Sequence, residues 1–144
     1  MAKPEEVLHK QVAAYIKLQY PDVIFFSESS GLRLKSWGQH NLLKAIRSDG
    51  KLPDIFIAFP VEGYNEKNVA VRFCGFFLEL KTEGTIVYRN DGEVTANKHI
   101  RAQMETLKRL YEIGYAATFG VGYDNSTKLI DDYMKIPKRK QKNG

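Results

Sequence analysis

The stretch "GFFLELKTEG", residues 75–84, decides the fold, because it is an apolar run that carries two charges near its end. Side chains alternate across a β-strand, so Phe77, Glu79 and Lys81 share one face, while Phe76 and the two leucines share the other. Burying charged groups is costly unless they are paired or hold an ion. The stretch therefore predicts a core strand with a functional site on one of its faces.

The composition is that of one soluble globular domain. The 144 residues are 43% hydrophobic and 27% charged, which suffices to bury a core. No apolar run approaches the roughly 20 residues needed to span a bilayer, and the N-terminus lacks the apolar core of a signal peptide. We therefore expect a cytoplasmic protein without a membrane partner. The single cysteine, Cys74, excludes an internal disulfide and a cysteine-rich zinc site.

The net charge of +5 comes from the C-terminal end of the chain. The last ten residues hold five of the 22 Lys and Arg and no acidic residue, which leaves 17 basic against 17 acidic residues in the remainder. We expect one domain over residues 1–134 and a basic, flexible tail over residues 135–144. The tail either binds phosphates or is simply solvated.

Hydrophobic periodicity predicts a mixed α/β domain with helices against a mixed sheet. A polar connection is expected over residues 61–70, and Asp91-Gly92 predicts a hairpin in a small flap. The expected helices cover residues 5–19, the second half of 36–50, 97–113 and 126–135, and the expected strands cover residues 22–29, 53–59, 71–81 and 115–123.

Two of these strands bring acidic groups together if they are antiparallel neighbours. Asp54 then begins one strand beside the end of the other, where Glu79 lies. Two carboxylates suit Mg²⁺ or Mn²⁺, which also takes waters and phosphate oxygens. Lys81 on the same face would supply positive charge near a metal-activated water that attacks phosphorus. The alternative is a solvated Glu79–Lys81 pair on an exposed face, with Asp54 merely following a turn proline.

Two further polar residues fall on otherwise apolar helix stripes. Glu5 continues the stripe of the first helix and is the better candidate than Glu6 for a third acidic ligand; alternatively it only stabilises the helix N-terminus. Gln103 lies within the apolar stripe of the helix over 97–113 and needs hydrogen-bond partners there. A site water, a phosphate, a metal-bound carboxylate or a plain backbone group would each satisfy it.

With Glu5, Pro53-Asp54, Glu79-x-Lys81 and Gln103 in this order, the chain resembles the PD-(D/E)xK nuclease superfamily, and more closely its VRR-NUC family of small phage and bacterial proteins. The resemblance covers residues 5 to about 134. It implies a restriction-endonuclease-like fold, a mixed central sheet flanked by helices. The chain departs from the family pattern at the turn Ser29-Ser30-Gly31 and at Lys51-Leu52 before the Pro-Asp pair.

The resemblance also implies roles for these residues. By this resemblance, Asp54 and Glu79 bind Mg²⁺ or Mn²⁺, and Glu5 completes the acidic site. Lys81 assists catalysis, and Gln103 supports the site. The implied activity is metal-dependent endonuclease cleavage of DNA, with branched DNA such as four-way junctions as the substrate. The implied assembly is a homodimer in the cytoplasm of a bacterium or phage-infected host, with no small-molecule cofactor.

Other residues have weaker claims on function. Arg33, Lys35, Lys98 and Arg101 are candidate nucleic-acid contacts, or else ordinary solvated charges. Tyr88 can stack on an unpaired base, as can Trp37, although core packing is commoner for aromatic side chains. The three histidines, His9, His40 and His99, are expected to be core or surface residues.

Two rival functions remain open. Within the enzymes, a restriction-type nuclease acting on linear duplex DNA is the nearest alternative. The other is a non-catalytic DNA-binding module that retains the nuclease fold. An intact acidic set favours an enzyme over the module, because a module has no use for unpaired buried carboxylates.

Overall fold

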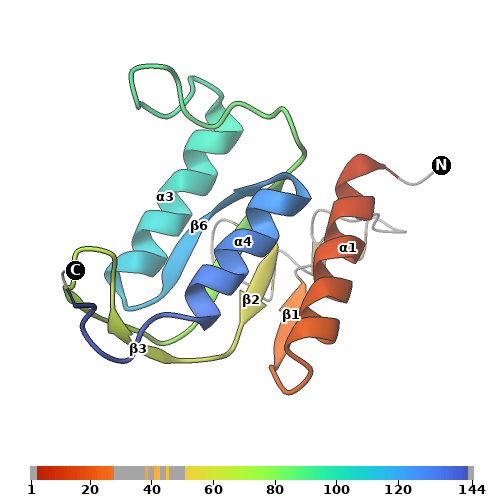
Figure 1. The fold of residues 1–144 in the computed structure, drawn as a ribbon. Helices are drawn as coiled ribbons and strands as arrows, with labels where there is room; N and C mark the ends of the chain where they lie inside the picture. Colours follow the sequence, from red (N-terminus) through yellow and green to blue (C-terminus); the bar gives the residue numbers. More distant parts are fainter. Residues whose placement is uncertain (1–2, 28–37, 39–40, 43–44, 46–50, 143–144) are drawn as a thin grey trace.

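A mixed sheet forms the centre of the protein in the computed structural model, which describes residues 3–27, 38, 41–42, 45 and 51–142 (Figure 1). In this part of the chain the strand order is β1-β2-β5-β6; the pairs β1–β2 and β2–β5 are antiparallel, and β5–β6 is parallel. The elements are α1 (Pro4–Gln19), β1 (Phe25–Ser27), β2 (Ile55–Ile57), β3 (Val61–Tyr64), β4 (Ala70–Phe73), β5 (Phe76–Lys81), α3 (Lys98–Glu112), β6 (Ala116–Val121) and α4 (Gly122–Met134).

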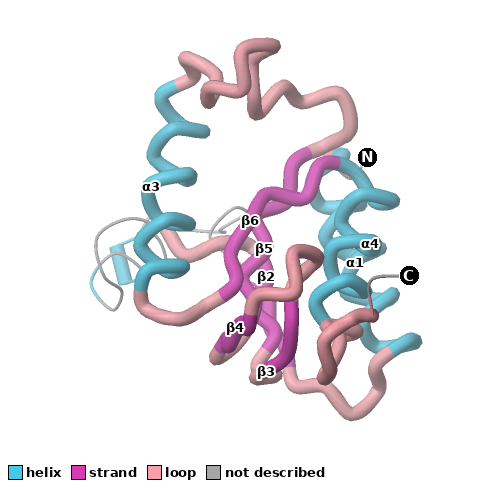
Figure 2. The backbone as a smooth tube through the Cα atoms, turned by 60° about the vertical axis from the view of Figure 1, so that its left-hand side comes forward, coloured by secondary structure: helices cyan, strands magenta, loops and turns pink. Residues whose placement is uncertain are grey.

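Helices cover both faces of this sheet. Figure 2 shows α3 on one side of β5 and β6, and α1 with α4 on the other. The predicted mixed sheet flanked by helices is therefore confirmed. No helix among the described residues is long and apolar enough to cross a membrane.

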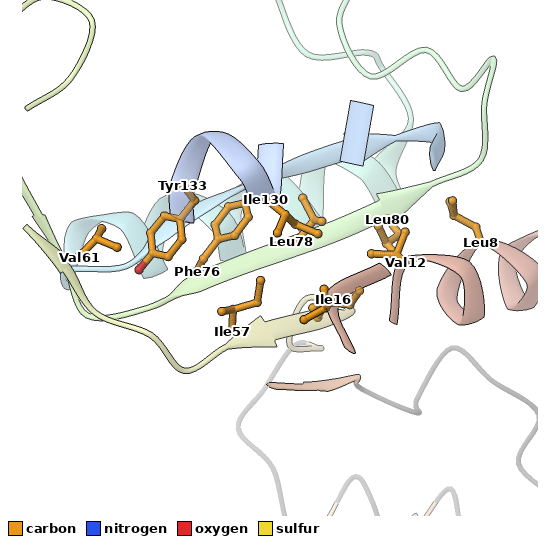
Figure 3. Close-up of a cluster of buried hydrophobic side chains, with 11 residues drawn as sticks. Leu8, Val12, Ile16, Ile57, Val61, Phe76, Leu78, Leu80, Ile130 and Tyr133 are labelled. Carbon is orange, nitrogen blue, oxygen red and sulfur yellow. The ribbon is translucent and has the colours of Figure 1, made fainter. Parts of the chain in front are cut away.

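The predicted alternation along β5 is also confirmed. Phe76, Leu78 and Leu80 are buried in the larger core, together with Val12 and Ile16 of α1 (Figure 3). The opposite face of the strand is turned toward α3, so Glu79 and Lys81 lie on the α3 side of the sheet. The first amphipathic helix and the central strand thus fix which face of the sheet carries the charges.

The prediction for residues 61–81 was wrong in part. Instead of a polar connection followed by one long strand, β3 and β4 form a separate antiparallel hairpin before β5 begins. Asn65 builds the turn, since its Oδ1 accepts hydrogen bonds from the backbone N–H groups of Lys67 and Val69. Asn68 adopts a positive φ of 57° there, a conformation that Asn tolerates better than most residues.

The remaining element predictions hold with shifted bounds. α3 ends two residues before Gly114, which has a φ of 109°, and Tyr88 pairs with Val94 across the predicted hairpin turn. α4 begins at Gly122, four residues earlier than expected. The helix expected in the second half of residues 36–50 falls mostly outside the described residues, as does the turn Ser29-Ser30-Gly31.

The basic segment after α4 contacts the β3–β4 hairpin. The N–H of Tyr64 donates to the carbonyl of Pro137 at 2.9 Å. Asn68 and Gln141 exchange two hydrogen bonds, of 2.9 and 3.2 Å. The segment expected to be a flexible tail is thus hydrogen-bonded to the hairpin up to residue 141, and the boundary of the domain at residue 134 stays a prediction.

Candidate active site

The strand pairing places Asp54 beside Glu79. β2 and β5 are antiparallel neighbours, with Ile55 opposite Leu78, so Asp54, directly before β2, lies level with Glu79. The backbone N–H of Leu80 donates to Oδ2 of Asp54 at 2.8 Å, and the carboxyl groups of Asp54 and Glu79 are close enough for each to shift the pKa of the other. The antiparallel pairing that the sequence reading required is therefore present.

Burial and mutual repulsion push the two carboxyl groups to different protonation states. Burial raises the pKa of Glu79 well above its usual range, and the negative charge of Asp54 raises it further, against the weaker opposing effect of Lys81 and Lys51. Burial would also raise the pKa of Asp54, but hydrogen bonds from His9, Glu79 and the Leu80 N–H outweigh it and hold the pKa below its ordinary value. The pair therefore shares one proton at neutral pH.

Two side chains from different helices hold this pair in place. Gln103 of α3 donates from Nε2 to Oε1 of Glu79 at 2.8 Å. His9 of α1 lies with Nε2 3.5 Å from Oδ1 of Asp54, and only 9% of the residue is exposed. Gln103 Oε1 and His9 Nδ1 are buried and have no hydrogen-bond partner among the described residues. Each therefore offers one further polar atom inside the site.

The pair opens into a pocket of about 270 Å³. It is formed by the first turns of α1 and α3, the approach to β2 and the end of β5 with its following loop. Five predicted site residues line it: Glu5, Asp54, Glu79, Lys81 and Gln103. Residues from four separate parts of the chain thus converge on one pocket.

Two of the predicted nucleic-acid contacts, Lys98 and Arg101, lie outside the lining of this pocket. Both are exposed on α3, and the Nε of Arg101 donates to the carbonyl of Thr95. Arg33 and Lys35 lie outside the described residues, as do Trp37 and His40. A role for these cations in binding nucleic acid stays a prediction.

The sequence reading missed several residues of the pocket. His9, taken there as a core or surface histidine, is buried against Asp54, and the pocket wall also includes Lys51, Asn97 and His99. The one available signal was the position of His9, which follows Glu5 by four residues and so shares its helix face. Nothing in the local sequence indicates that His99 or Lys51 reaches the same pocket.

The donor set fits a divalent cation held by two carboxylates. Among the residues that the structure describes, no group of three or more His, Cys, Asp or Glu side chains is arranged to hold a metal, so Glu5 lines the pocket without joining such a cluster. Mg²⁺ commonly takes one or two carboxylates and completes its shell with water and phosphate oxygens. The proton shared by Asp54 and Glu79 is what a cation between them would displace.

Comparison with known proteins agrees with the fold. No family model matches the sequence, and no curated protein matches it. A solved structure described as a "VRR_NUC domain protein" superimposes with a TM-score of 0.62 over 96% of this chain and 94% of that one, at 19% sequence identity. The chain has the fold of a VRR-NUC protein. The fold expected from the residues shared with the VRR-NUC family is thus confirmed across nearly the whole chain.

Proposed function

We propose that this protein is a metal-dependent endonuclease that hydrolyses phosphodiester bonds in DNA. The observation that carries the proposal is the adjacent carboxyl pair of Asp54 and Glu79, which opens into a pocket that Lys81 also lines. The VRR-NUC fold, found over nearly the whole chain, supports the proposal. A non-catalytic module would keep two costly buried carboxyl groups without using them.

Each residue of the pocket has a proposed role. Asp54 and Glu79 would hold Mg²⁺ or Mn²⁺, and Gln103 would orient Glu79. Lys81, whose charge already acts on Glu79, would stabilise the negative charge that develops on the phosphate. Glu5, on the pocket wall, would bind a water of the metal or the attacking water. A bound divalent ion supplies an activated water and neutralises phosphate oxygens.

The substrate proposed is branched DNA, and the working form is a homodimer. Two copies related by a two-fold axis would present two pockets to a substrate that is itself two-fold symmetric, such as a four-way junction. The main alternative is a nuclease that cuts linear duplex without regard to branches.

Incubation of the protein with labelled four-way, flap and linear DNA tests this proposal. Parallel reactions contain Mg²⁺, Mn²⁺ or EDTA, and products are resolved on denaturing gels. We expect paired nicks on opposing strands of the junction with Mg²⁺ or Mn²⁺, and none with EDTA. Equal nicking of all three substrates would favour the linear-duplex alternative. Binding of DNA without any cleavage would favour the alternative that the protein is a non-catalytic DNA-binding module.

A further inference from the structure

A second hollow lies at the opposite end of the sheet from the catalytic pocket. It has a volume of about 690 Å³ and is bounded by the β3–β4 hairpin, the last turn of α3, α4 and the segment after α4. Figures 1 and 2 place the hairpin at the end of the molecule away from the first turns of α1 and α3, which form the catalytic pocket. The two hollows are therefore separate.

Aromatic rings form much of its wall. Phe73 lies between Tyr111 and Tyr133, with ring centroids 6.2 and 6.3 Å away, and Phe76 stacks on Tyr133 at 4.9 Å. Tyr111 is 61% exposed although it lines the hollow. An exposed ring beside partly and fully buried ones is a surface on which another flat ring can stack.

The basic C-terminal segment, residues 135–142, forms one rim of this hollow and is fixed there by contacts with the hairpin. Ile136 and Pro137 pack so closely on Gly63 that a Cβ at that position would overlap the carbonyl oxygen of Pro137 and lie 2.7 Å from Cγ2 of Ile136. The paired hydrogen bonds between Asn68 and Gln141 fix the other end. The hairpin thus holds this segment as a fixed edge.

That edge concentrates the excess positive charge of the protein. All five basic residues of the segment are exposed, namely Lys135, Lys138, Arg139, Lys140 and Lys142. Lys138 and Arg72 of β4 line a separate hollow against the hairpin.

Two carboxylates, Glu66 and Asp132, also line the hollow with the aromatic wall, and Asp132 is paired with Lys128 at 2.6 Å. Lys67 and Lys135 line the hollow together with these carboxylates, and the Nζ of Lys140 lies 6.0 Å from the ring centre of Tyr64, another lining residue. The remaining cations of the segment extend the positive charge along the edge of the hollow.

We propose that this hollow and its basic rim bind a single-stranded nucleic-acid segment, with phosphates on the cations and an unpaired base against Tyr111. Proteins that bind single strands combine a positively charged surface with rings on which bases stack. In a duplex both ring faces of each base are already covered by its neighbours. An acidic peptide would use the cations but leave the rings idle, so single strands fit both features.

The helix α3 connects the two hollows. Asn97 at its start lines the catalytic pocket and Tyr111 near its end lines the second hollow, about 21 Å apart along a helix that rises 1.5 Å per residue. A nucleic-acid strand bound at the second hollow could therefore extend along α3 and reach the catalytic pocket. This inference concerns binding and stands whether or not the pocket cleaves DNA.

Fluorescence anisotropy with EDTA present tests it without cleavage. The probes are a labelled oligo(dT), an oligo(U) of the same length, a hairpin duplex and a poly-glutamate peptide. Lys135→Gln/Lys140→Gln removes two rim charges, and Lys10→Gln/Lys17→Gln removes two exposed charges from α1 as the matched control. Tyr111→Ala removes the stacking ring. Asn68→Gly keeps the positive φ and every charge but loses both hydrogen bonds to Gln141.

We expect the rim double variant to weaken single-strand binding about 10- to 30-fold at 0.1 M salt and to lower the salt dependence by about 1.4 logarithmic units per decade, which corresponds to two lost phosphate contacts. Tyr111→Ala should weaken single-strand binding about tenfold and leave duplex binding unchanged. Asn68→Gly should weaken single-strand binding several-fold, and the α1 control variant should change it less than twofold. Oligo(dT) and oligo(U) distinguish DNA from RNA as the ligand.

Several results would overturn the proposal. Wild-type single-strand affinity in the rim double variant, or an equal loss of affinity in the α1 control variant, would contradict it. So would an unchanged affinity in Tyr111→Ala, or an affinity for poly-glutamate equal to that for oligo(dT). Thermal melts of each variant show that it is folded, and Tyr111→Ala is expected to melt as the wild type does because the ring is largely exposed.

Discussion

Gln103 Nε2 donates a 2.8 Å hydrogen bond to Glu79 Oε1, joining the helix on one face of the sheet to the central strand. The contact explains why a polar amide falls in the apolar stripe of α3. It also supplies Glu79 with a donor that remains useful when the carboxylate is ionised. Gln103 is therefore a positioning residue for Glu79.

Replacing Gln103 should impair the site without unfolding the protein. Gln103→Leu keeps the approximate volume but removes the donor, so Glu79 loses its fixed orientation. Partners of metal ligands typically contribute 10- to 100-fold to activity or metal affinity, and we expect a loss in that range. Cleavage rates and Mn²⁺ titration calorimetry measure it. Gln11→Leu on the exposed side of α1 is the control, and equal activity of the two variants would contradict the assignment.

Removing His9 should shift the acid limb of the pH–rate profile. His9 helps to hold the pKa of Asp54 below its ordinary value, so in His9→Ala that pKa rises. Because the proposed metal ligand is the ionised form of Asp54, activity should then be lost at a higher pH than in the wild type. Cleavage rates between pH 4 and pH 8 test this. Lys10→Ala, next to it on the exposed side of α1, should leave the acid limb in place.

Glu79→Gln should stabilise the metal-free protein at neutral and alkaline pH. The folded-state pKa of Glu79 is raised above its usual value, so the native state keeps a proton that the unfolded state releases above about pH 4.5. Wild-type stability therefore falls as pH rises through this region. Glutamine cannot ionise, so the variant escapes this loss. We expect the difference in free energy of unfolding between Glu79→Gln and the wild type to be about 1–3 kcal/mol more favourable to the variant at pH 8 than at pH 5.

Urea denaturation in EDTA at the two pH values measures this difference. Glu112→Gln, an exposed substitution on α3, controls for the loss of one negative charge. A Glu79→Gln variant that is destabilised equally at both pH values would show that the carboxyl group is ionised and stably paired in the metal-free protein.

Outside the candidate active site, the carboxylate of Asp131 links α4 to α1. It accepts hydrogen bonds from Tyr15 at 2.7 Å and Tyr20 at 2.5 Å. Burial would raise the pKa of Asp131, but these two hydrogen bonds outweigh it and lower the pKa. The same bond raises the pKa of Tyr15 to about 12. The cluster therefore stabilises the fold between about pH 4 and pH 10, and its contribution is lost below and above that window.

Tyr20→Phe should lower the free energy of unfolding by about 1 kcal/mol at pH 7, a value reduced for partial exposure of the cluster. The deficit should shrink below pH 4, where Asp131 becomes protonated. Chemical denaturation at pH 7 and pH 3 tests both statements. Tyr88→Phe, in the exposed loop before α3, should have no effect, and a constant deficit at both pH values would assign the loss to packing.

The sequence predicted what depends on strong local patterns. The alternation of β5 placed Glu79 and Lys81 on one face, and Pro53 marked the start of the strand at Asp54. That Asp54 lies beside Glu79 followed only on the assumption that the two strands are antiparallel neighbours. The β3–β4 hairpin was missed because its strands have only four residues each and its turn is built by Asn65 and Asn68 rather than by glycine. The spacing of His9 from Glu5 gives its helix face, but its distance from Asp54 depends on how α1 packs on the sheet, which no local pattern encodes.

The docking of the C-terminal segment is another contact between distant parts of the chain. Its composition predicts a solvated tail, because five basic residues carry little apolar surface. What holds it is the absence of a side chain at Gly63 and the amide of Asn68, both more than 70 residues away in the sequence. Neither feature is visible from the segment alone.

Cleavage of supercoiled plasmid and a four-way junction by the wild type, Asp54→Asn and Glu79→Gln most directly tests whether this carboxyl pair is a metal-dependent nuclease site. Both variants keep side-chain volume and should remain folded, as checked by thermal melts. We predict Mg²⁺- or Mn²⁺-dependent nicking by the wild type and a loss of at least 100-fold in each variant, with DNA binding retained. Wild-type cleavage rates in either folded variant would contradict the account.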